Sequence, residues 1–244
     1  MSSNDRPQFA GAFGGGGLFG IGYSMGVLDA LRRDGIDLRN SPMLGTSAGS
    51  WAASAIALDV SFERLSSLRT PRFPNPRAGL LEKSARLVFG RATSPLVSVV
   101  ACELPRLKRT VISGATTPLS VAVAASSAVP GLLSPQRING RRFVDGGVRS
   151  MVSVDLASPA DTLIVIAPLA GAMFGPFNNL VQRNTADEVE EWKQKHGGQV
   201  MFFAPSETIA KVATLPHHLF DRDRGLAAYE LALTETRLET QRSR

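Results

Sequence analysis

The amino-acid sequence predicts an α/β protein with a mostly parallel central sheet. Residues 8–58 alternate short apolar runs, which suit buried strands, with segments whose apolar residues recur at helical spacing. A later β-branched run, Leu163 to Ala167, suits a strand that is covered on both faces. Strands that alternate with helices are typical of parallel sheets, because each helix carries the chain back to the start of the next strand.

The composition is that of a globular protein. Of the 244 residues, 43% are hydrophobic and 20% are charged, which argues against a disordered chain. We expect one domain over residues 1–244, because neither an internal repeat nor a clear linker is evident. The single cysteine, Cys102, excludes an intrachain disulfide and a cysteine-rich zinc site. We expect neither a metal nor a cofactor.

The charge balance is basic, with a net charge of +6. Such a charge suits nucleic acid or an anionic lipid surface, and the absence of a nucleic-acid-binding motif makes nucleic acid the weaker prediction. No apolar run reaches the roughly 18 residues of a membrane-spanning helix. The polar start, Met1 to Pro7, does not resemble a secretory signal. We therefore expect a cytoplasmic protein that contacts a membrane only peripherally.

The expected elements follow the apolar pattern along the chain. Residues Gln8–Phe13 predict a strand, and four glycines separate it from a helix over Leu18–Arg33. A second strand starts at Pro42 and a second helix covers Trp51–Leu58. Further helices are expected at Ala78–Phe89, Leu96–Leu107, Thr117–Ala128 and Leu226–Leu238, strands at Leu163–Ala167 and Val200–Ala204, and a hairpin over Arg137–Val144 that turns at Asn139-Gly140.

The segment Gly45-Thr46-Ser47-Ala48-Gly49 matches the pattern G-x-S-x-G. Small neighbours allow a serine to sit on a tight turn between a strand and a helix, where the helix N-terminus directs N–H groups at the reacting atoms. Because the segment follows an apolar strand and precedes an alanine-rich helix, Ser47 is a candidate nucleophile. The alternative is a small-residue turn without chemistry.

The glycine run Gly14–Gly17 lies between the first strand and the first helix. Its N–H groups can converge on an anion, either the oxyanion of acyl transfer or a phosphate. Gly15, Gly17 and Gly20 also fit G-x-G-x-x-G, and Asp37 follows twenty residues after Gly17, which is a dinucleotide-binding fingerprint. The loop alone therefore does not separate a hydrolase from a cofactor domain.

A serine nucleophile needs a base. His217 and His218 are formally possible, but they follow Pro216 in a polar, loop-like stretch that favours a surface or helix-start position. The other candidate is Asp145, which ends an apolar run and precedes Gly146-Gly147. An aspartate serves as the base for a serine only where a dry site raises its pKa or the oxyanion loop stabilises most of the charge.

Taken together, these motifs resemble the patatin-like phospholipase family. The resemblance rests on Gly14–Gly20, Gly45–Gly49 and Asp145-Gly146-Gly147 in this order, with Ala125–Gly131 and Val154-Asp155-Leu156 as supporting text. It implies a three-layer α/β/α fold and an acyl hydrolase of phospholipids or other acyl esters. It further implies a dyad in which Ser47 is the nucleophile and Asp145 the base, with an oxyanion hole from Gly15, Gly16 and Gly17.

The chain departs from the family pattern in three places. Phe19 stands where the family usually has Arg or Lys, and Ser150-Met151 stand where Asn-Pro is frequent. Ser47 and Asp145 are only 98 positions apart, which predicts an open or trimmed substrate groove. The basic segment Arg69–Arg91 can cover this groove or contact anionic lipid.

Three functions follow from these motifs. The first is a serine acyl hydrolase with lipid or phospholipid esters as substrates. The second is a non-catalytic lipid-binding relative, suggested by the three departures. The third is a dinucleotide-binding oxidoreductase that uses Gly15, Gly17 and Gly20, which leaves Ser47 and Asp145 without a role.

Overall fold

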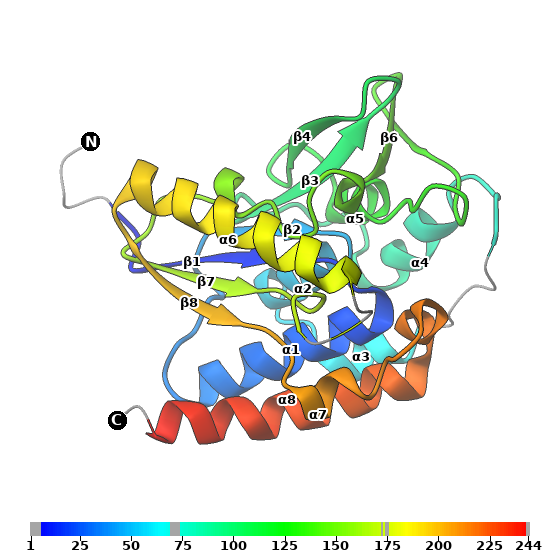
Figure 1. The fold of residues 1–244 in the computed structure, drawn as a ribbon. Coiled ribbons are helices and arrows are strands. Elements are labelled where there is room, and N and C mark those ends of the chain that lie inside the picture. The colour runs from blue at the N-terminus through cyan, green and yellow to red at the C-terminus, as the bar shows by residue number, and fades with distance from the viewer. Residues whose placement is uncertain (1–5, 69–73, 172, 174–175, 243–244) are drawn as a thin grey trace.

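A mixed eight-stranded sheet forms the centre of the computed structural model, which describes residues 6–68, 74–171, 173 and 176–242 (Figure 1). The strand order is β5-β6-β3-β2-β1-β7-β8, and β4 pairs with β3 off this path. The pairs among β3, β2, β1, β7 and β8 are parallel, whereas β4 and β6 run antiparallel to β3, and β5 runs antiparallel to β6. The strands are β1 (Phe9–Phe13), β2 (Met43–Thr46), β3 (Val97–Glu103), β4 (Lys108–Ser113), β5 (Gln136–Ile138), β6 (Arg141–Asp145), β7 (Thr162–Ile166) and β8 (Gln199–Phe203).

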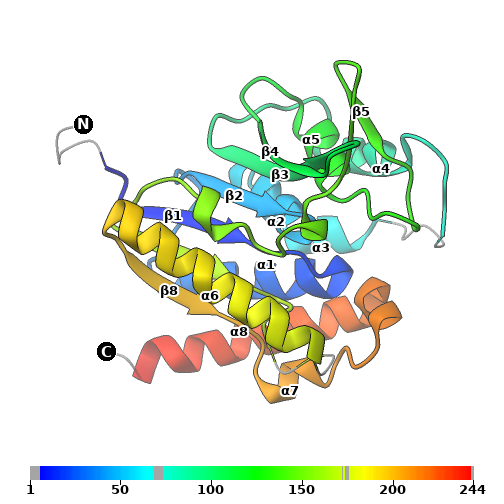
Figure 2. The ribbon, with the colours of Figure 1, turned by 45° about the horizontal axis from the view of Figure 1, so that its top comes forward.

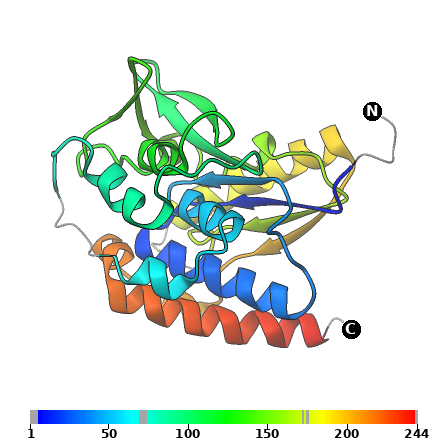
Figure 3. The same cartoon turned by 180° about the vertical axis from the view of Figure 1, so that it is seen from behind.

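Helices cover both faces of this sheet. The α-helices are α1 (Gly17–Arg33), α2 (Ala48–Ala57), α3 (Phe62–Ser66), α4 (Leu80–Phe89), α5 (Leu119–Ser126), α6 (Pro176–His196), α7 (Glu207–Ala210) and α8 (Arg222–Arg242), and three short 3₁₀ turns are η1 (Gly146–Val148), η2 (Val154–Leu156) and η3 (Pro216–Phe220). Helix α6 crosses one face (Figure 2), and α1 and α2 lie on the other (Figure 3). The predicted three-layer α/β/α architecture is therefore confirmed.

The C-terminal helix α8 packs along the outer side of α1 (Figure 3). Tyr229 of α8 donates a 2.8 Å hydrogen bond to Asp29 of α1, and its ring stacks on Phe62 of α3 at a centroid distance of 4.3 Å. Burial and the neighbouring Asp29 raise the pKa of Tyr229 to about 12, so the phenol keeps the proton of this bond.

No helix in the described part of the chain has the length and apolarity to cross a bilayer.

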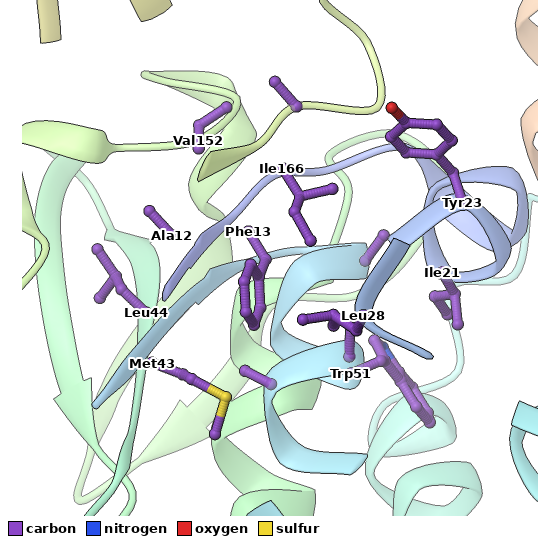
Figure 4. Close-up of a cluster of buried hydrophobic side chains, with 14 of the residues drawn as sticks. Ala12, Phe13, Ile21, Tyr23, Leu28, Met43, Leu44, Trp51, Val152 and Ile166 are labelled. Carbon is purple, nitrogen blue, oxygen red and sulfur yellow. The ribbon is translucent and has the colours of Figure 1, made fainter. Parts of the chain in front are cut away.

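The main core lies between the sheet and the helices on the α1 face. Phe13, Met43 and Ile166 from the strands pack with Leu28 of α1 and Trp51 of α2 (Figure 4). Each large apolar side chain removed from water contributes about 1.5–3 kcal/mol. This packing fixes the carboxyl ends of β1 and β2, where the glycine loop and Ser47 begin.

Most predicted elements are confirmed, including the Asn139-Gly140 hairpin, whose two turn residues have φ values of 48° and 78°. The helix predicted over Leu96–Leu107 is wrong. Residues Val97–Glu103 form β3, a strand with neighbours on both sides. A buried strand is apolar on both faces, so this run lacks the alternation that distinguishes a strand from a buried helix.

Candidate active site

Ser47 occupies a tight turn between β2 and α2. Its backbone has φ 51° and ψ −118°, a positive-φ conformation that is costly for a residue with a side chain. The turn requires small neighbours, because a Cβ on Gly49 would lie 2.0 Å from the carbonyl oxygen of Phe13. The strain presents Ser47 at the carboxyl edge of the parallel strands, at the N-terminus of α2, as a nucleophile on such a turn requires.

Asp145 ends β6 and lies on the same pocket as Ser47. Its side chain is 5% exposed, and one carboxylate oxygen accepts a 2.7 Å hydrogen bond from the Gly147 N–H. Burial raises the pKa of Asp145 to about 6, while hydrogen bonding to the Ser47 side chain and to the Gly147 N–H acts in the opposite direction. A carboxylate with this pKa is a better proton acceptor than an exposed aspartate and is still ionised at neutral pH.

The glycine loop connects β1 to α1. The Gly14 N–H donates to the Ile166 carbonyl and the Gly15 N–H donates to the Met151 carbonyl, both at 2.8 Å. Within the described residues, the N–H groups of Gly16 and Gly17 have no backbone acceptor. Of the three amides assigned by resemblance to the oxyanion hole, Gly15 is thus engaged, and the other two are free of the backbone.

Two pockets meet at Ser47. The wider one, of about 560 Å³, contains Asp145 and the backbone of the glycine loop. The narrower one, of about 100 Å³, is apolar and runs between α1, α2, α3 and α4. Four residues line both: Gly17, Ser47, Val129 and Phe220. A molecule whose reacting carbon lies at Ser47 can therefore extend into two differently shaped spaces.

The walls of the narrow pocket come largely from the short segment between Ser47 and Asp145. Leu65 of α3, Leu68, and Leu81 and Ser84 of α4 all contribute. Within the basic segment Arg69–Arg91, residues 69–73 lie outside the described residues, whereas α4 forms part of the wall. Phe19, at the position where the family usually has a cation, is fully buried in the core.

Sequence reasoning missed the contribution of η3. Leu219 and Phe220 line the wide pocket together with Pro216, and a Cβ on Gly17 would lie 2.5 Å from the Leu219 carbonyl oxygen. Only the apolar pair after His218 marked this turn in the sequence, and nothing placed it beside a loop two hundred residues earlier. Neither His217 nor His218 is among the described lining residues of the two pockets.

The dinucleotide fingerprint does not assemble into one site. Asp37 lies beyond the C-terminal end of α1, whereas the glycine loop lies at its N-terminal end, about 25 Å away along a 17-residue helix. The Asp37 carboxylate instead pairs with Arg39 at 2.6 Å, and the hydrogen bond to this guanidinium lowers the pKa of Asp37. Among the described residues, no cluster of histidine, cysteine and acidic side chains is suited to a metal ion.

The chain is similar both to solved structures and to the sequences of other proteins. Among solved structures, VipD from Legionella pneumophila has 14% identity and a TM-score of 0.42, with 95% of this chain and 67% of that chain covered. Human GIVD cytosolic phospholipase A2 in complex with methyl gamma-linolenyl fluorophosphonate has 10% identity and a TM-score of 0.41, with 97% and 58% covered.

The sequence matches include the segment around Asp145. Residues 105–158 match the model of the family described as patatin-like phospholipase. Uncharacterized NTE family proteins of Mycobacterium bovis and Mycobacterium tuberculosis are 28% identical over 202 residues, which cover 77% of this chain and 56% of theirs. The match thus spans little more than half the length of these curated relatives. These matches confirm that the chain resembles the patatin-like phospholipase family, as its motifs indicate.

Proposed function

We propose that residues 1–244 form one serine acyl hydrolase domain that cleaves carboxylic esters of lipids or phospholipids. The observation that carries the proposal is the pocket shared by Ser47, buried Asp145 and the glycine loop. In this loop the Gly16 and Gly17 amides have no backbone acceptor among the described residues. The resemblance to patatin-like phospholipases supports a lipid ester hydrolase in general terms.

The reaction begins with attack of Ser47 Oγ on the ester carbonyl carbon while its proton passes to the Asp145 carboxylate. The carbonyl electron pair moves to oxygen, and the N–H groups of Gly16 and Gly17 stabilise the resulting oxyanion. Collapse breaks the bond to the alkoxide, which takes the proton from Asp145 and leaves as an alcohol. Water then attacks the acyl-enzyme, gives its proton to Asp145 and releases the acid, with the proton returned to Ser47.

The narrow pocket is the proposed site of the acyl chain. Its described lining includes Ile21, Trp51, Leu81 and Leu132, and apolar surface favours a hydrocarbon chain by about 25 cal/mol per Å² buried. The wider pocket, which holds Asp145, then takes the alcohol side of the ester.

A cytoplasmic location and peripheral contact with an anionic membrane complete the proposal. Helix α4 supports membrane contact, because it forms a pocket wall and carries exposed Lys83, Arg86 and Leu87 on its surface. Basic side chains beside exposed apolar ones suit anionic lipid.

Turnover of an acyl-ester panel tests the proposal. We expect hydrolysis of p-nitrophenyl esters and of phospholipid vesicles by the parent protein, and kcat lower by about 10³-fold or more in Ser47→Ala and in Asp145→Asn. Asp161→Asn is the matched control, because Asp161 is 65% exposed and lies outside both pockets. Lipid binding without turnover by the folded parent would instead support the non-catalytic alternative.

A further inference from the structure

The backbone N–H of Ser47 has a side-chain partner on another element. It donates a 2.8 Å hydrogen bond to Oγ of Ser126, the last residue of α5. The same Oγ donates to the Val100 carbonyl of β3 at 2.6 Å. A backbone N–H can only donate and a carbonyl can only accept, so these two partners fix the direction of the hydroxyl proton.

The hydroxyl lies where the ladder between β2 and β3 stops. Thr46 is the last residue of β2 and is the register partner of Val100. Ser47 follows, but its positive-φ backbone takes the chain away from the sheet into α2. The Ser126 hydroxyl therefore bridges the N–H of Ser47, the first residue after β2, to the Val100 carbonyl of β3. Both backbone groups thus have a hydrogen-bond partner.

Removal of this hydroxyl leaves two backbone groups without partners beside a strained turn. The Ser126 side chain is fully buried, and an unpaired buried polar group favours any backbone rotation that restores a bond. The turn sets the direction of Ser47 Oγ toward Asp145 and the glycine-loop amides, and a displacement of about 1 Å at a reacting atom can lower the rate about 100-fold.

We propose that Ser126 is a positioning residue that holds the turn of Ser47 in its reactive conformation, an inference that rests on the proposed acyl hydrolase function. It acts through the backbone N–H of Ser47 and does not touch the substrate. Its effect is therefore on the chemical step, seen in kcat and in the labelling rate of Ser47, rather than on substrate binding.

The same helix offers a control of the same chemical type. Ser120 of α5 is also fully buried, and its hydroxyl donates to the Gly90 carbonyl at 2.9 Å, but it lies outside both pockets. Ser120→Ala therefore removes a comparable buried bond without touching the turn of Ser47. Ser127 offers a contrast, because its hydroxyl accepts from Trp51 Nε1 at 3.1 Å on the wall of the narrow pocket.

The test compares variants on p-nitrophenyl butyrate and by the rate of fluorophosphonate labelling. For Ser126→Ala we expect kcat and the labelling rate to fall about 100-fold, with KM within about threefold and the pH midpoint unchanged. Ser120→Ala should keep the parent kcat, and Ser127→Ala should change KM more than kcat. Ser126→Thr keeps the hydroxyl and should recover kcat to within about tenfold of the parent.

Two results would overturn the proposal: a folded Ser126→Ala with the kcat and labelling rate of Ser120→Ala, or a folded Ser126→Thr as slow as Ser126→Ala. If the alanine variant does not fold, Ser126→Cys replaces it, since a thiol is a weak donor and acceptor, and equal rates for Cys and Thr would count against the role. Parent activity that survives Ser47→Ala would refute the proposed function itself, which is a separate outcome.

Discussion

The backbone N–H of Gly15 donates a 2.8 Å hydrogen bond to the carbonyl oxygen of Met151, six residues after Asp145. Next to it, Thr46 Oγ1 donates to the Val152 carbonyl at 3.1 Å. The chain that follows Asp145 is thus bonded both to the glycine loop and to β2, the strand that ends at Thr46 just before Ser47. The bond to Met151 also occupies the Gly15 amide, which leaves Gly16 and Gly17 as the proposed donors to the oxyanion.

This arrangement predicts unequal effects of alanine along the loop. Gly17 has φ +60° and its added Cβ would meet the Leu219 carbonyl at 2.5 Å, whereas a Cβ on Gly15 would lie 3.4 Å from Ser47 Cβ. Because this clash displaces the Gly17 N–H, we expect Gly17→Ala to lower kcat by about 10²-fold or more, the usual loss for an oxyanion donor. We expect Gly15→Ala to lower kcat less. Steady-state kinetics on a short ester measures both.

Gly35→Ala is the control for backbone strain. Gly35 has φ +92° with open space around it, and it lies past the far end of α1. The Gly35→Ala variant should lose about 1 kcal/mol of stability and keep the kcat of the parent. Equal kcat values for Gly17→Ala and the parent would exclude the loop from transition-state binding.

The buried carboxylate of Asp145, which the proposed reaction needs, is expected to destabilise the folded protein. Its pKa of about 6 in the folded state exceeds the value of 3.8 for an unperturbed aspartate, so the folded state binds this proton more tightly than the unfolded state does. The contribution of Asp145 to the unfolding free energy therefore falls as the pH rises from about 4 to 6 and is then constant. A shift of about two units corresponds to a loss on the order of 3 kcal/mol.

Asp145→Asn removes this loss, because the amide stays neutral. We expect the inactive variant to be more stable than the parent at pH 8 by up to about 3 kcal/mol, and the difference to shrink toward pH 4. Urea unfolding of both proteins at the two pH values measures it. A stability difference that does not change with pH would show that the carboxyl of Asp145 is not desolvated.

Phe220 lies at the junction of the two pockets, so it is expected to govern which acyl chains fit. Phe220→Ala joins the spaces around Ser47. We expect KM for long p-nitrophenyl esters to change by about tenfold relative to short ones, since burying a Phe-sized apolar side chain is worth about 1.5–3 kcal/mol. Leu215→Ala is the control, because Leu215 precedes the same turn and is 50% exposed. Identical chain-length profiles for Phe220→Ala and the parent would contradict this assignment.

Arg109 of β4 forms ion pairs that are expected to stabilise the fold. Its guanidinium makes two bonds to Asp155, at 2.7 and 2.8 Å, and one to Glu188 of α6 at 3.3 Å. Burial raises the pKa of Glu188, whose other oxygen accepts from the Val154 N–H at 3.0 Å. This cluster joins β4, η2 and α6, and so holds the segment after Met151.

Arg109→Met leaves the buried Asp155 and the half-buried Glu188 without their cation. We expect a loss toward the lower end of the 3–5 kcal/mol typical of a broken buried pair, about 3 kcal/mol, since the Arg109 side chain is 30% exposed. Arg141→Met is the control, because Arg141 pairs with Glu103 at the surface, and its loss should cost much less stability than that of Arg109. Equal losses in urea unfolding would remove the special role of Arg109.

Local chemistry explains which parts of the fold could be predicted. The glycine loop, the turn at Ser47 and the Asn139-Gly140 hairpin each depend on residues that tolerate a positive φ or a close approach of the backbone, and the sequence shows these residues directly. The sequence of β3 does not distinguish this strand from a helix, because a strand with neighbours on both sides carries no alternation. The hydrogen bonds made by the Ser126 hydroxyl and by the Met151 carbonyl join segments that are far apart in the sequence. Residue spacing does not encode such contacts.

The proposed substrate pocket is only partly predictable for the same reason. The motifs place Ser47 and Asp145, but Phe220 reaches the pocket because α8 docks on α1 and carries η3 over the glycine loop. The departure at Phe19 has a packing explanation, since this side chain is fully buried in the core.

Labelling with a fluorophosphonate, followed by intact-mass and peptide analysis, tests the central claim that Ser47 is an activated nucleophile served by Asp145. The account predicts one adduct, on Ser47, that forms faster as the pH rises through about 6, is absent in Ser47→Ala and forms slowly in Asp145→Asn. A folded protein that takes no adduct, or an adduct on another residue that persists in Ser47→Ala, would contradict it.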